Sequence, residues 1–379
     1  MQHQNLYKQP EMKISYPTDH TTWYKSCNTN QPLILKASAI WSLKIATPGS
    51  GVFNRMAGSN RLNKPRHGSL QFRPHSRAKK QAFRIRNWAR VNTTKLLGFL
   101  GYKVGMTHVL IRDNKSTSIT KGMQVSIPVT VIECPPMKPL SIRFYKHTPY
   151  GAKVITEIFS TKVDKNITSS KKPSKEPTEF DDIKLAIYTQ PKLIGFKKNP
   201  DILELALSGN KDEKLKLAKE LLEKEIKVSE VFKEGQYIDV HSVTTGKGFQ
   251  GTVKIHGVKI RRHKSEKVKR GVGTLGPWTP SRVNLEVAQP GKMGYHARTE
   301  ANKWLMKISN KLEDVKIKGG FMHYGHVKNE YVIIKGSVAG PTKRAITLTE
   351  PTRFLGKSLV PEILAVSLES KQWKQHYLI

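Results

Sequence analysis

Runs of apolar residues with strand character, bounded by turn residues, predict short β-strands through most of the chain after residue 95. The pattern occupies residues 96–111, 126–133, 141–145, 183–189, 202–207, 236–243, 331–338 and 344–349. Turn residues such as Asp113 and Asn114 follow the first of these segments. Short strands with glycines at their bends favour a small barrel over an open sheet, so we expect a mainly β protein.

Two segments predict helices instead. Residues 211–227 place charged side chains on one helical face and apolar ones on the other, namely Leu215, Ala218, Leu222 and Ile226. Thr299 is a suitable N-cap for a shorter helix that contains Trp304 and Leu305. The longer helix and the strands next to it predict an α/β piece inserted into the barrel.

Residues 267–282 predict a loop, because three glycines oppose a helix and two prolines exclude a central strand position. Trp278 lies between Pro277 and Pro280, with three cationic residues before Gly271 and one after Pro280. RNA suits such a loop, since phosphates bind the cations and an unstacked base stacks on the ring. A solvated hairpin tip with one anchoring tryptophan is the alternative interpretation.

The net charge predicts a polyanionic partner. The chain has 66 Lys and Arg against 29 Asp and Glu, a formal net charge of +37. Repulsion at this charge opposes compaction unless a polyanion compensates it. A membrane is not the expected partner, because the sequence has no apolar run of about 18 residues and no basic amphipathic helix. Two cysteines are too few for a disulfide framework, so a reducing compartment is expected.

The charge is distributed unevenly along the chain. Residues 61–90 contain ten cationic and no acidic residues, and residues 241–310 contain fourteen against three. Residues 181–235 are balanced, with eleven of each sign. This segregation predicts two segments that face RNA and one domain that faces solvent. A nuclear-targeting signal or a solubilising tail would also explain the first basic segment.

These patterns divide the chain into an N-terminal extension, a basic arm, and a barrel interrupted by an insertion. The predicted ranges are 1–55 for the unassigned extension, 56–94 for the arm, 95–150 for the first part of the barrel, 151–235 for the inserted α/β domain, and 236–379 for the rest of the barrel with a basic loop at about 244–310. The extension is interpreted as a lineage-specific addition or a misplaced start codon. A mitochondrial transit segment is the less favoured alternative, because acidic residues are few but Arg55 is the only arginine there.

Residues 246–251 match the dinucleotide-binding pattern G-x-G-x-x-G. The residues that follow, 252–255, predict a strand, whereas a dinucleotide site requires a helix within a βαβ unit. We therefore interpret the motif as a flexible turn that brings Lys247 and the backbone close to phosphates. A second glycine-rich basic segment, residues 290–300, presents Tyr295 and His296 for stacking and Lys292 and Arg298 for phosphates. The alternative interpretation is a helix-entry turn with Thr299 as its cap, and both interpretations can hold at once.

No catalytic or metal-binding pattern accompanies these segments. The histidines lack carboxylate or cysteine partners at the spacing of a metal or acid–base site. No Ser/His/Asp, Cys/His or paired-carboxylate arrangement occurs either. We expect no enzyme activity, no cofactor, no metal and no small-molecule substrate. Histidines among basic residues are interpreted as hydrogen-bond donors or stacking rings for RNA.

Four ordered motifs then identify a family resemblance. Residues 274–283, 294–303, 319–325 and 340–348, together with 98–107 and 245–251, closely resemble ribosomal protein L three of the large subunit, in its archaeal and eukaryotic form. The resemblance implies a barrel like the second domain of translation elongation factors, with an α/β insertion and long basic extensions that penetrate RNA. It also implies a loop that reaches toward the peptidyl transferase centre, with Trp278 at its tip.

The predicted function is that of a structural constituent of the large ribosomal subunit in the cytoplasm. Its partners would be large-subunit rRNA and neighbouring ribosomal proteins, and it would contribute to ribosome assembly. The predicted rRNA-binding residues are Arg66, Arg73, Arg77, Lys79, Lys80, Arg84, Arg86, Lys247, His256, Arg261, Arg262, Lys264, Lys269, Arg270, Trp278, Arg282, Lys292, His296 and Arg298. The alternatives are a free-standing RNA-modifying or nucleotide-binding enzyme that uses residues 246–251, and a nonspecific DNA-packaging protein.

Overall fold

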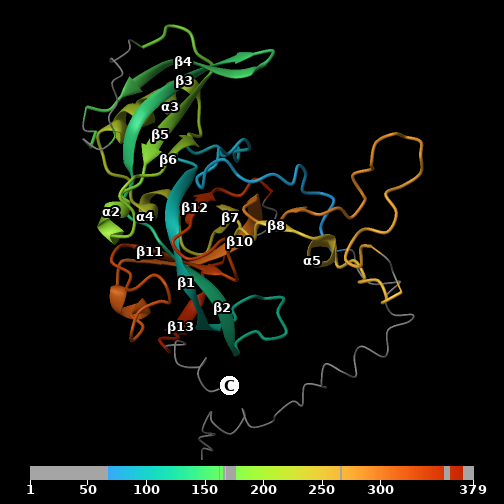
Figure 1. Cartoon of the computed structure of the whole chain (residues 1–379). Coiled ribbons are helices and arrows are strands. Elements are labelled where there is room, and N and C mark those ends of the chain that lie inside the picture. Colours follow the sequence, from blue (N-terminus) through green and yellow to red (C-terminus); the bar gives the residue numbers. More distant parts are fainter. Residues whose placement is uncertain are drawn as a thin grey trace, which may run out of the picture. The chain divides into compact units, whose positions relative to one another are not determined.

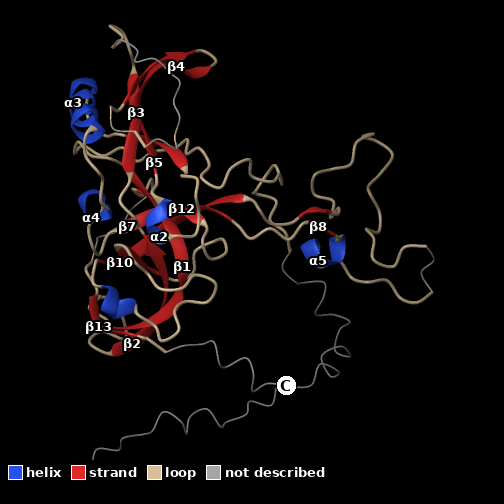
Figure 2. Ribbon diagram, turned by 60° about the vertical axis from the view of Figure 1, so that its left-hand side comes forward, coloured by secondary structure: helices blue, strands red, loops and turns tan. Residues whose placement is uncertain are grey.

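The computed structural model describes residues 67–161, 163–164, 167, 176–264, 267–353 and 359–369 (Figures 1 and 2). Backbone contacts divide the chain after Pro65, and all described residues belong to the second unit. The predicted extension at residues 1–55 and the cation Arg66 lie outside the described part of the chain.

Six antiparallel strands form a closed barrel. They are β1 (Gly98–Arg112), β2 (Gln124–Glu133), β11 (Tyr331–Lys335), β10 (Ala297–Ser309), β7 (Tyr237–Val243) and β12 (Ala345–Thr349), named in the order in which they pair. β12 also pairs with β1, which closes the ring. β13 (Glu362–Val366) pairs with the second half of β1, beyond its contact with β12. The prediction of a mainly β protein is confirmed, and these strands close into a small barrel.

β1 contains an irregularity where it pairs with β2. The register between β1 and β2 shifts between Lys103 and Gly105, as at a β-bulge. A Cβ atom on Gly105 would lie 2.7 Å from the ring of the buried Phe321, so no larger residue fits without a rearrangement. This is the role that the sequence predicted for glycines at strand bends.

A second antiparallel sheet follows the order β4 (Gly151–Phe159), β3 (Lys138–Thr148), β5 (Asp182–Tyr188) and β6 (Ile202–Ala206). β3 falls inside the range expected for the barrel but belongs to this sheet. The helix α3 (Lys211–Leu222) packs on β3 and β5 (Figure 1). The remaining short elements are α2 (Pro191–Ile194), α4 (Val228–Val231), α5 (Thr252–His256), the 3-10 helix η1 (Leu312–Val315), β8 (Phe249–Gln250) and β9 (Gly291–Lys292).

α3 is confirmed but ends earlier than predicted. Asn210 and Glu213 form a capping box at its start. The predicted helix continued to residue 227 because Ile226 kept the apolar spacing. Instead, Ile226 exchanges two backbone hydrogen bonds of 2.9 Å with Met137 and is buried through that pairing.

One apolar core joins the barrel to the second sheet. Phe99, Leu100 and Ile132 of the barrel belong to the same buried cluster as Phe144 and Leu185 of the second sheet. Because the two sheets share this core, each stabilises the other, at roughly 25 cal/mol for each Å² of apolar surface buried.

Two predicted elements are wrong. The short helix expected around Trp304 is part of the strand β10, which pairs with β7 and β11 on its two sides. Backbone pairing on both edges outweighs the capping tendency of Thr299, and a bulge at Asn302, with φ of 55°, accommodates the irregular pattern. The strand expected at residues 252–255 is the helix α5, which begins after Gly251 and ends at the left-handed Gly257.

Candidate nucleic-acid interface

The interface starts from a two-stranded extension of the barrel. β7 and β10 continue beyond the barrel as residues 244–250 and 291–296, which we call the ribbon, and β8 and β9 pair within it. The N–H of Lys247 donates to the carbonyl oxygen of Met293 at 2.9 Å, so the two chains remain hydrogen-bonded along the ribbon. In Figures 1 and 2 the ribbon projects from the barrel toward α5.

A long irregular loop follows α5. The described residues of 267–282 contain no helix or strand, which confirms the predicted loop. Arg261 organises its base, since its N–H donates to the carbonyl oxygen of Lys269 at 3.1 Å and its guanidinium donates to that of Val272 at 2.9 Å. The side chain of Trp278 is 96% exposed. The ring predicted to face RNA thus has almost no contact with the protein.

The basic arm, residues 56–94, is described from His67 onward and runs along the ribbon and β10. The N–H of Ala78 donates to the carbonyl oxygen of Tyr295 at 2.8 Å. The guanidinium carbon of Arg298 lies 4.1 Å from the ring centre of Phe72. Further along, Ala82 and Ile85 are buried against the fold. The arm is therefore anchored at intervals by apolar and backbone contacts, while most of its cations remain exposed.

Two predicted histidines connect the arm to the ribbon and the loop. One ring nitrogen of His256 lies 3.3 Å from the carbonyl oxygen of His67 and the other lies 3.2 Å from that of Gln289. Nδ1 of His296 lies 3.0 Å from the carbonyl oxygen of Ser76. Both rings thus contact the protein's own backbone, and they position the arm, the ribbon and the loop relative to each other.

The predicted cations fall into two groups. The exposed ones are Arg73, Arg77, Lys79, Lys80, Arg84, Arg86, Lys247, Arg261, Arg262, Lys264, Lys269, Arg270, Arg282 and Lys292. Arg298 is half-buried, and burial lowers the pKa of its guanidinium. None of the predicted cations in the described ranges belongs to an ion pair; the cations that do are Lys95, Arg112, Lys138, Arg143, Lys146, Lys197, Lys211, Lys214, Lys219, Lys303 and Lys307.

Arg84 differs from the other exposed cations because it lies near a carboxylate. Burial raises the pKa of Glu204, but the hydrogen bond from Tyr145 and the charges of Arg143 and Arg84 lower it more, so its pKa falls below the ordinary value. Arg84 therefore stabilises the charge of Glu204, besides being exposed to solvent.

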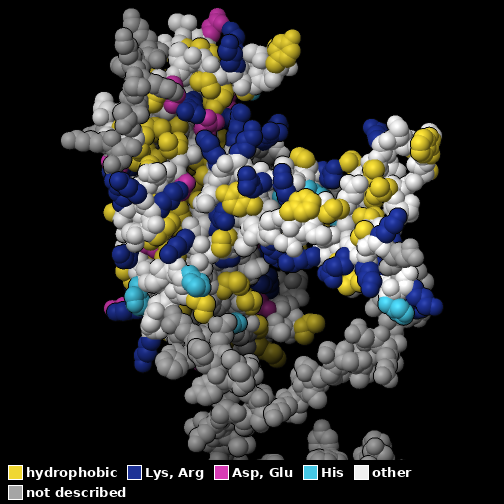
Figure 3. Space-filling model, viewed as in Figure 1, with side chains coloured by type: hydrophobic (Ala, Val, Ile, Leu, Met, Phe, Trp, Pro, Cys, Tyr) yellow, Lys and Arg dark blue, Asp and Glu magenta, His cyan; other side chains and the backbone are white. Residues whose placement is uncertain are grey.

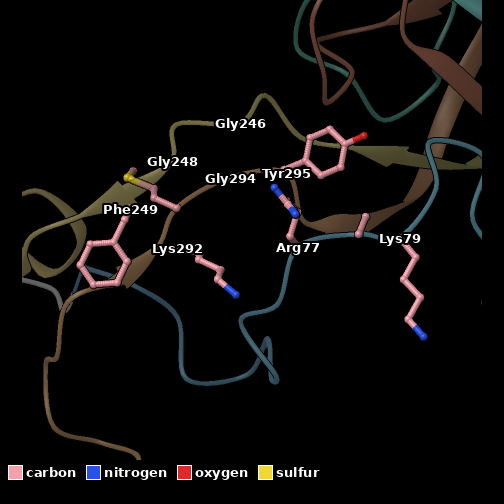
Figure 4. A pocket seen from close by; sticks show the side chains of 10 residues that line it. Arg77, Lys79, Gly246, Gly248, Phe249, Lys292, Gly294 and Tyr295 are labelled. Carbon is pink, nitrogen blue, oxygen red and sulfur yellow. The ribbon is translucent and has the colours of Figure 1, made fainter.

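The arm and the ribbon enclose a cleft of about 800 Å³. Figure 4 shows Arg77 of the arm across from Phe249 and Lys292 of the ribbon. Phe249 was not among the predicted site residues, although its ring is 71% exposed. The sequence did contain a signal for this residue, namely an aromatic side chain within a glycine-rich basic turn. The turn lies outside the predicted strands, so no strand pattern required this ring to be buried.

The charged side chains on the surface also differ between the projecting loop and the second sheet (Figure 3). Dark-blue Lys and Arg side chains lie along the projecting loop, at the right of the view, whereas magenta Asp and Glu side chains are interspersed with them over the second sheet, at the top. A surface of exposed, unpaired cations with exposed aromatic rings is suited to bind a polyanion that also carries rings.

Comparison with known proteins assigns the family. The family model described as "Ribosomal protein L3" matches residues 57–176 and 174–368. A protein of Methanobrevibacter smithii named large ribosomal subunit protein uL3 is 44% identical over 332 residues, which cover 82% of this chain and 99% of that protein. The chain belongs to the ribosomal protein L3 family. Proteins of the same name from Archaeoglobus fulgidus (44% identity, 82% of this chain and 99% of that protein) and Methanocaldococcus jannaschii (41%, 83% and 99%) are also similar.

The L3 match includes all the described segments of the interface. The arm from His67, the ribbon and the loop all lie within the matched ranges, which end at residue 368. The resemblance inferred from the four motifs is thereby confirmed. The archaeal L3 proteins are matched over nearly their whole length, while about a fifth of this chain lies outside the match.

The structure around residues 246–251 differs from a dinucleotide site of the kind considered at the outset. A helix, α5, does follow Gly251 in place of the expected strand. A dinucleotide site also requires parallel strands in a βαβ unit, and the described strand pairs are all antiparallel. Among the described residues, no three His, Cys, Asp or Glu side chains lie close enough to hold a metal ion. The described helices are all too short or too polar to cross a bilayer.

Proposed function

We propose that this member of the L3 family is a structural constituent of the large ribosomal subunit in the cytoplasm, where it binds and organises rRNA. The observation that supports this most is that the predicted cations on the described part of the arm, ribbon and loop are mostly exposed and form no ion pair, whereas the ion pairs found among the described residues all lie elsewhere in the fold. Such cations need counter-charge, and phosphates supply it. Neighbouring ribosomal proteins are the further partners that we propose.

Two physical effects would produce this function. Cations of the arm and loop neutralise phosphates and release condensed counterions, which lets rRNA segments approach one another. The exposed rings, above all Trp278, stack on unpaired bases and hold their conformation. We propose that the loop extends toward the peptidyl transferase centre. Catalysis there would belong to the RNA, so the protein would contribute the position of RNA groups and no reacting side chain.

The barrel would serve as the scaffold from which both basic segments extend. We propose that it is of the type found in the second domain of translation elongation factors, an interpretation that its closed antiparallel ring supports. We also propose an inserted α/β domain and place its start near Lys138, since β3 pairs within the second sheet and not within the barrel.

Sedimentation tests this function directly. The tagged chain, expressed in an archaeal host, should co-sediment with large subunits and remain bound through a high-salt wash, because an integrated protein is held by many simultaneous contacts. The purified chain should also bind a large-subunit rRNA transcript with an affinity that falls steeply with salt, by a log–log slope of roughly 0.7 to 0.9 for each phosphate contact. A chain that remains at the top of the gradient, or a flat salt response, would contradict the proposal.

A further inference from the structure

The cleft between the arm and the ribbon is lined by aromatic rings as well as cations, and phosphate binding alone does not require the rings. It is lined by Arg77, Ala78 and Lys79 of the arm and by residues of both ribbon chains, and its volume is about 800 Å³. This volume lies in the range of sites that hold a small molecule or a single nucleotide unit. The inference below rests on the proposed RNA binding and concerns what occupies this cleft.

Phe249 provides an unoccupied aromatic face. The residue lies on β8 directly opposite Lys292 of β9, and its ring is 71% exposed. A ribbon of this length has no apolar core that the ring could stabilise. In Figure 4 the ring lies at one end of the cleft, beside the side chain of Lys292. An exposed ring with a cation next to it fits a base and its phosphate better than it fits a phosphate alone.

Tyr295 has a different role in the same cleft. The guanidinium carbon of Arg344 lies 5.1 Å from its ring centre and covers one face of the ring. Its backbone has φ of 54° and its carbonyl oxygen accepts the N–H of Ala78, so the residue joins the ribbon to the arm. Tyr295 therefore forms a wall of the cleft, and Phe249 is the ring available for stacking.

Glycines keep the space in front of Phe249 open. Gly248 has φ of +69°, and a Cβ atom placed on it would have no atom within 4 Å. A Cβ on Gly294 would lie 2.1 Å from the carbonyl oxygen of Thr245, so the two ribbon chains can approach closely only because this residue is glycine. One side of the cleft is consequently formed by backbone, which a flat base can approach closely.

Cations from two different segments are placed to hold the phosphates. Arg77 belongs to the arm and Lys292 to the ribbon, and within the described residues neither forms an ion pair. In Figure 4 their side chains lie around the cleft between Phe249 and Tyr295, whereas the ammonium group of Lys79 points away from it. The arm and the ribbon are held together here by the hydrogen bond from Ala78 to Tyr295.

We propose that this cleft binds one unstacked rRNA nucleotide, with its base on the ring of Phe249 and its phosphates between Arg77 and Lys292. The binding is not specific for a base, because a stacking ring accepts every base and no buried polar group in the cleft reads the base edge. The site would fix a splayed nucleotide at the base of the projecting loop.

A pair of RNA probes tests the stacking contact on the full chain. Fluorescein-labelled uridine pentanucleotide is compared with the same RNA whose central nucleotide is abasic, which keeps all phosphates and removes one base. For the unaltered chain we expect about tenfold weaker binding of the abasic probe, as typical for the loss of one stacked base. For Phe249→Ala we expect the two probes to bind almost equally. Equal binding by the unaltered chain, or an undiminished ratio in Phe249→Ala, would overturn the inference.

Three further variants separate stacking from simple apolar contact and from nonspecific effects. Phe249→Tyr keeps a planar ring and should preserve the ratio, whereas Phe249→Leu keeps an apolar side chain and should lose it. Tyr150→Ala removes a fully exposed ring from the turn between β3 and β4 and should change nothing. A ratio retained by Phe249→Leu would exclude stacking on this ring. Because Phe249 is exposed, these substitutions leave the fold intact, which a thermal melt checks.

Photocrosslinking locates the base independently. The pentanucleotide with a central 4-thiouridine is irradiated with the full chain, and the crosslinked peptide is identified by mass spectrometry. We expect crosslinks at Phe249 or its neighbours in the ribbon; crosslinks only at Trp278 or in the second sheet would overturn the assignment. The salt dependence of pentanucleotide binding separates the two proposals. A steep dependence without the base effect would refute only the cleft assignment, and a flat dependence would refute RNA binding itself.

Discussion

The same cationic side chains have different surroundings in two regions of this protein. In the second sheet, Arg143 forms ion pairs with Glu157 and Glu204, and Lys214 lies 2.8 Å from Asp182. On the arm, the ribbon and the loop, the predicted cations among the described residues have no carboxylate partner of this kind. The first region has enough acidic residues to pair several of its own cations, whereas the second has few and depends on charge from another molecule.

This difference shows how a strongly basic chain still folds. The apolar core shared by the barrel and the second sheet supplies the stability, and the unpaired charge is placed on segments that contribute little to this core. Repulsion among those cations is reduced because they lie on an extended arm and loop. Under the proposed function, phosphates would neutralise these cations and the same segments would gain order from the partner.

The largest effect should come from removing charge from the loop. Replacing Arg262, Lys264, Lys269, Arg270 and Arg282 with glutamine should weaken binding to a large-subunit rRNA transcript by more than about a hundredfold at physiological salt. The log–log salt slope should become shallower by roughly 0.7 to 0.9 for each lost phosphate contact. Filter binding at several salt concentrations measures both quantities.

A matched variant carries the same change of net charge in the other region. Lys192, Lys198, Lys216, Lys224 and Lys233 are exposed on or near the second sheet, and their replacement with glutamine should leave the salt slope nearly unchanged. Equal losses of affinity in the two variants would mean that net charge alone governs binding. The proposed distinction between the regions would then be wrong.

Glu133, the last residue of the barrel strand β2, provides a strong test of the folded scaffold that carries the basic segments. Its carboxylate is buried and accepts hydrogen bonds from the hydroxyl of Tyr324 at 2.7 Å, the N–H of Lys328 at 3.1 Å, and both the backbone and side-chain nitrogens of Asn329 at 2.9 and 2.7 Å. Glu133→Ala leaves these donors without an acceptor and should lower the free energy of unfolding by about 3 kcal/mol. Urea denaturation measures the change.

A surface carboxylate is the control for Glu133. Glu362 forms an exposed ion pair with Arg112 at 3.4 Å, and Glu362→Ala should have little effect on unfolding, as usual for exposed pairs. Neither variant should alter the salt slope of RNA binding while the chain is folded. A stable Glu133→Ala variant would show that the buried network contributes less than its hydrogen bonds suggest.

His241 lies where the barrel meets the arm and should make stability depend on pH. Its ring nitrogens lie 2.9 Å from the hydroxyls of Thr299 and Thr349, and Phe83 of the arm packs edge-on against it. Burial lowers the pKa of His241 below its ordinary value of 6.5, although Asp239 opposes part of this shift.

The direction of this pH effect follows from proton uptake. Between the lowered pKa of the folded state and 6.5, the unfolded chain binds more protons than the folded one. Stability should therefore be full above pH 6.5 and decline as the pH falls below it. In His241→Gln, the thermal melting temperature should depend less on pH over this range. His326→Gln, at an exposed position, should keep the decline of the melting temperature with falling pH. An unchanged profile in His241→Gln would assign the effect to other groups.

A strand could be predicted from the sequence where buried and exposed side chains alternate along it. It could not be predicted where pairing with a neighbouring strand determines the structure. The second half of β1 alternates between buried and exposed residues, and its pattern was sufficient. β4 is mostly exposed on both faces and exists because β3 pairs with it, so its sequence carried no period to detect. β10 contains three consecutive buried residues from Trp304 to Met306, a pattern that neither strand nor helix periodicity reproduces.

The interface could be predicted as two segments but not as a cleft. Composition located the basic arm and the loop, because charge density is a local property of sequence. Their juxtaposition depends on contacts such as that between Ser76 and His296, which are 220 residues apart. Because the sequence does not reveal this pairing, it could not show that Phe249 and the arm line one cleft. For the same reason His256 and His296 were predicted to contact RNA, whereas in the structure their rings contact the protein's own backbone.

The smallest effect on stability should come from Trp278→Ala, and the comparison with Trp304 of the barrel strand β10 separates the basic loop from the folded scaffold. Trp304 is 5% exposed and its indole N–H donates to the carbonyl oxygens of Gly235 and Leu359 at 3.1 and 3.0 Å, so Trp304→Ala should cost about 3 to 5 kcal/mol. Trp278 is 96% exposed, and its removal should change the free energy of unfolding by less than about 0.5 kcal/mol. Large subunits containing Trp278→Ala should assemble but show altered peptide-bond formation or drug sensitivity, since the ring would act on RNA near the catalytic centre. Failure of these subunits to assemble would mean that the ring stabilises the particle and does not adjust the conformation of its RNA.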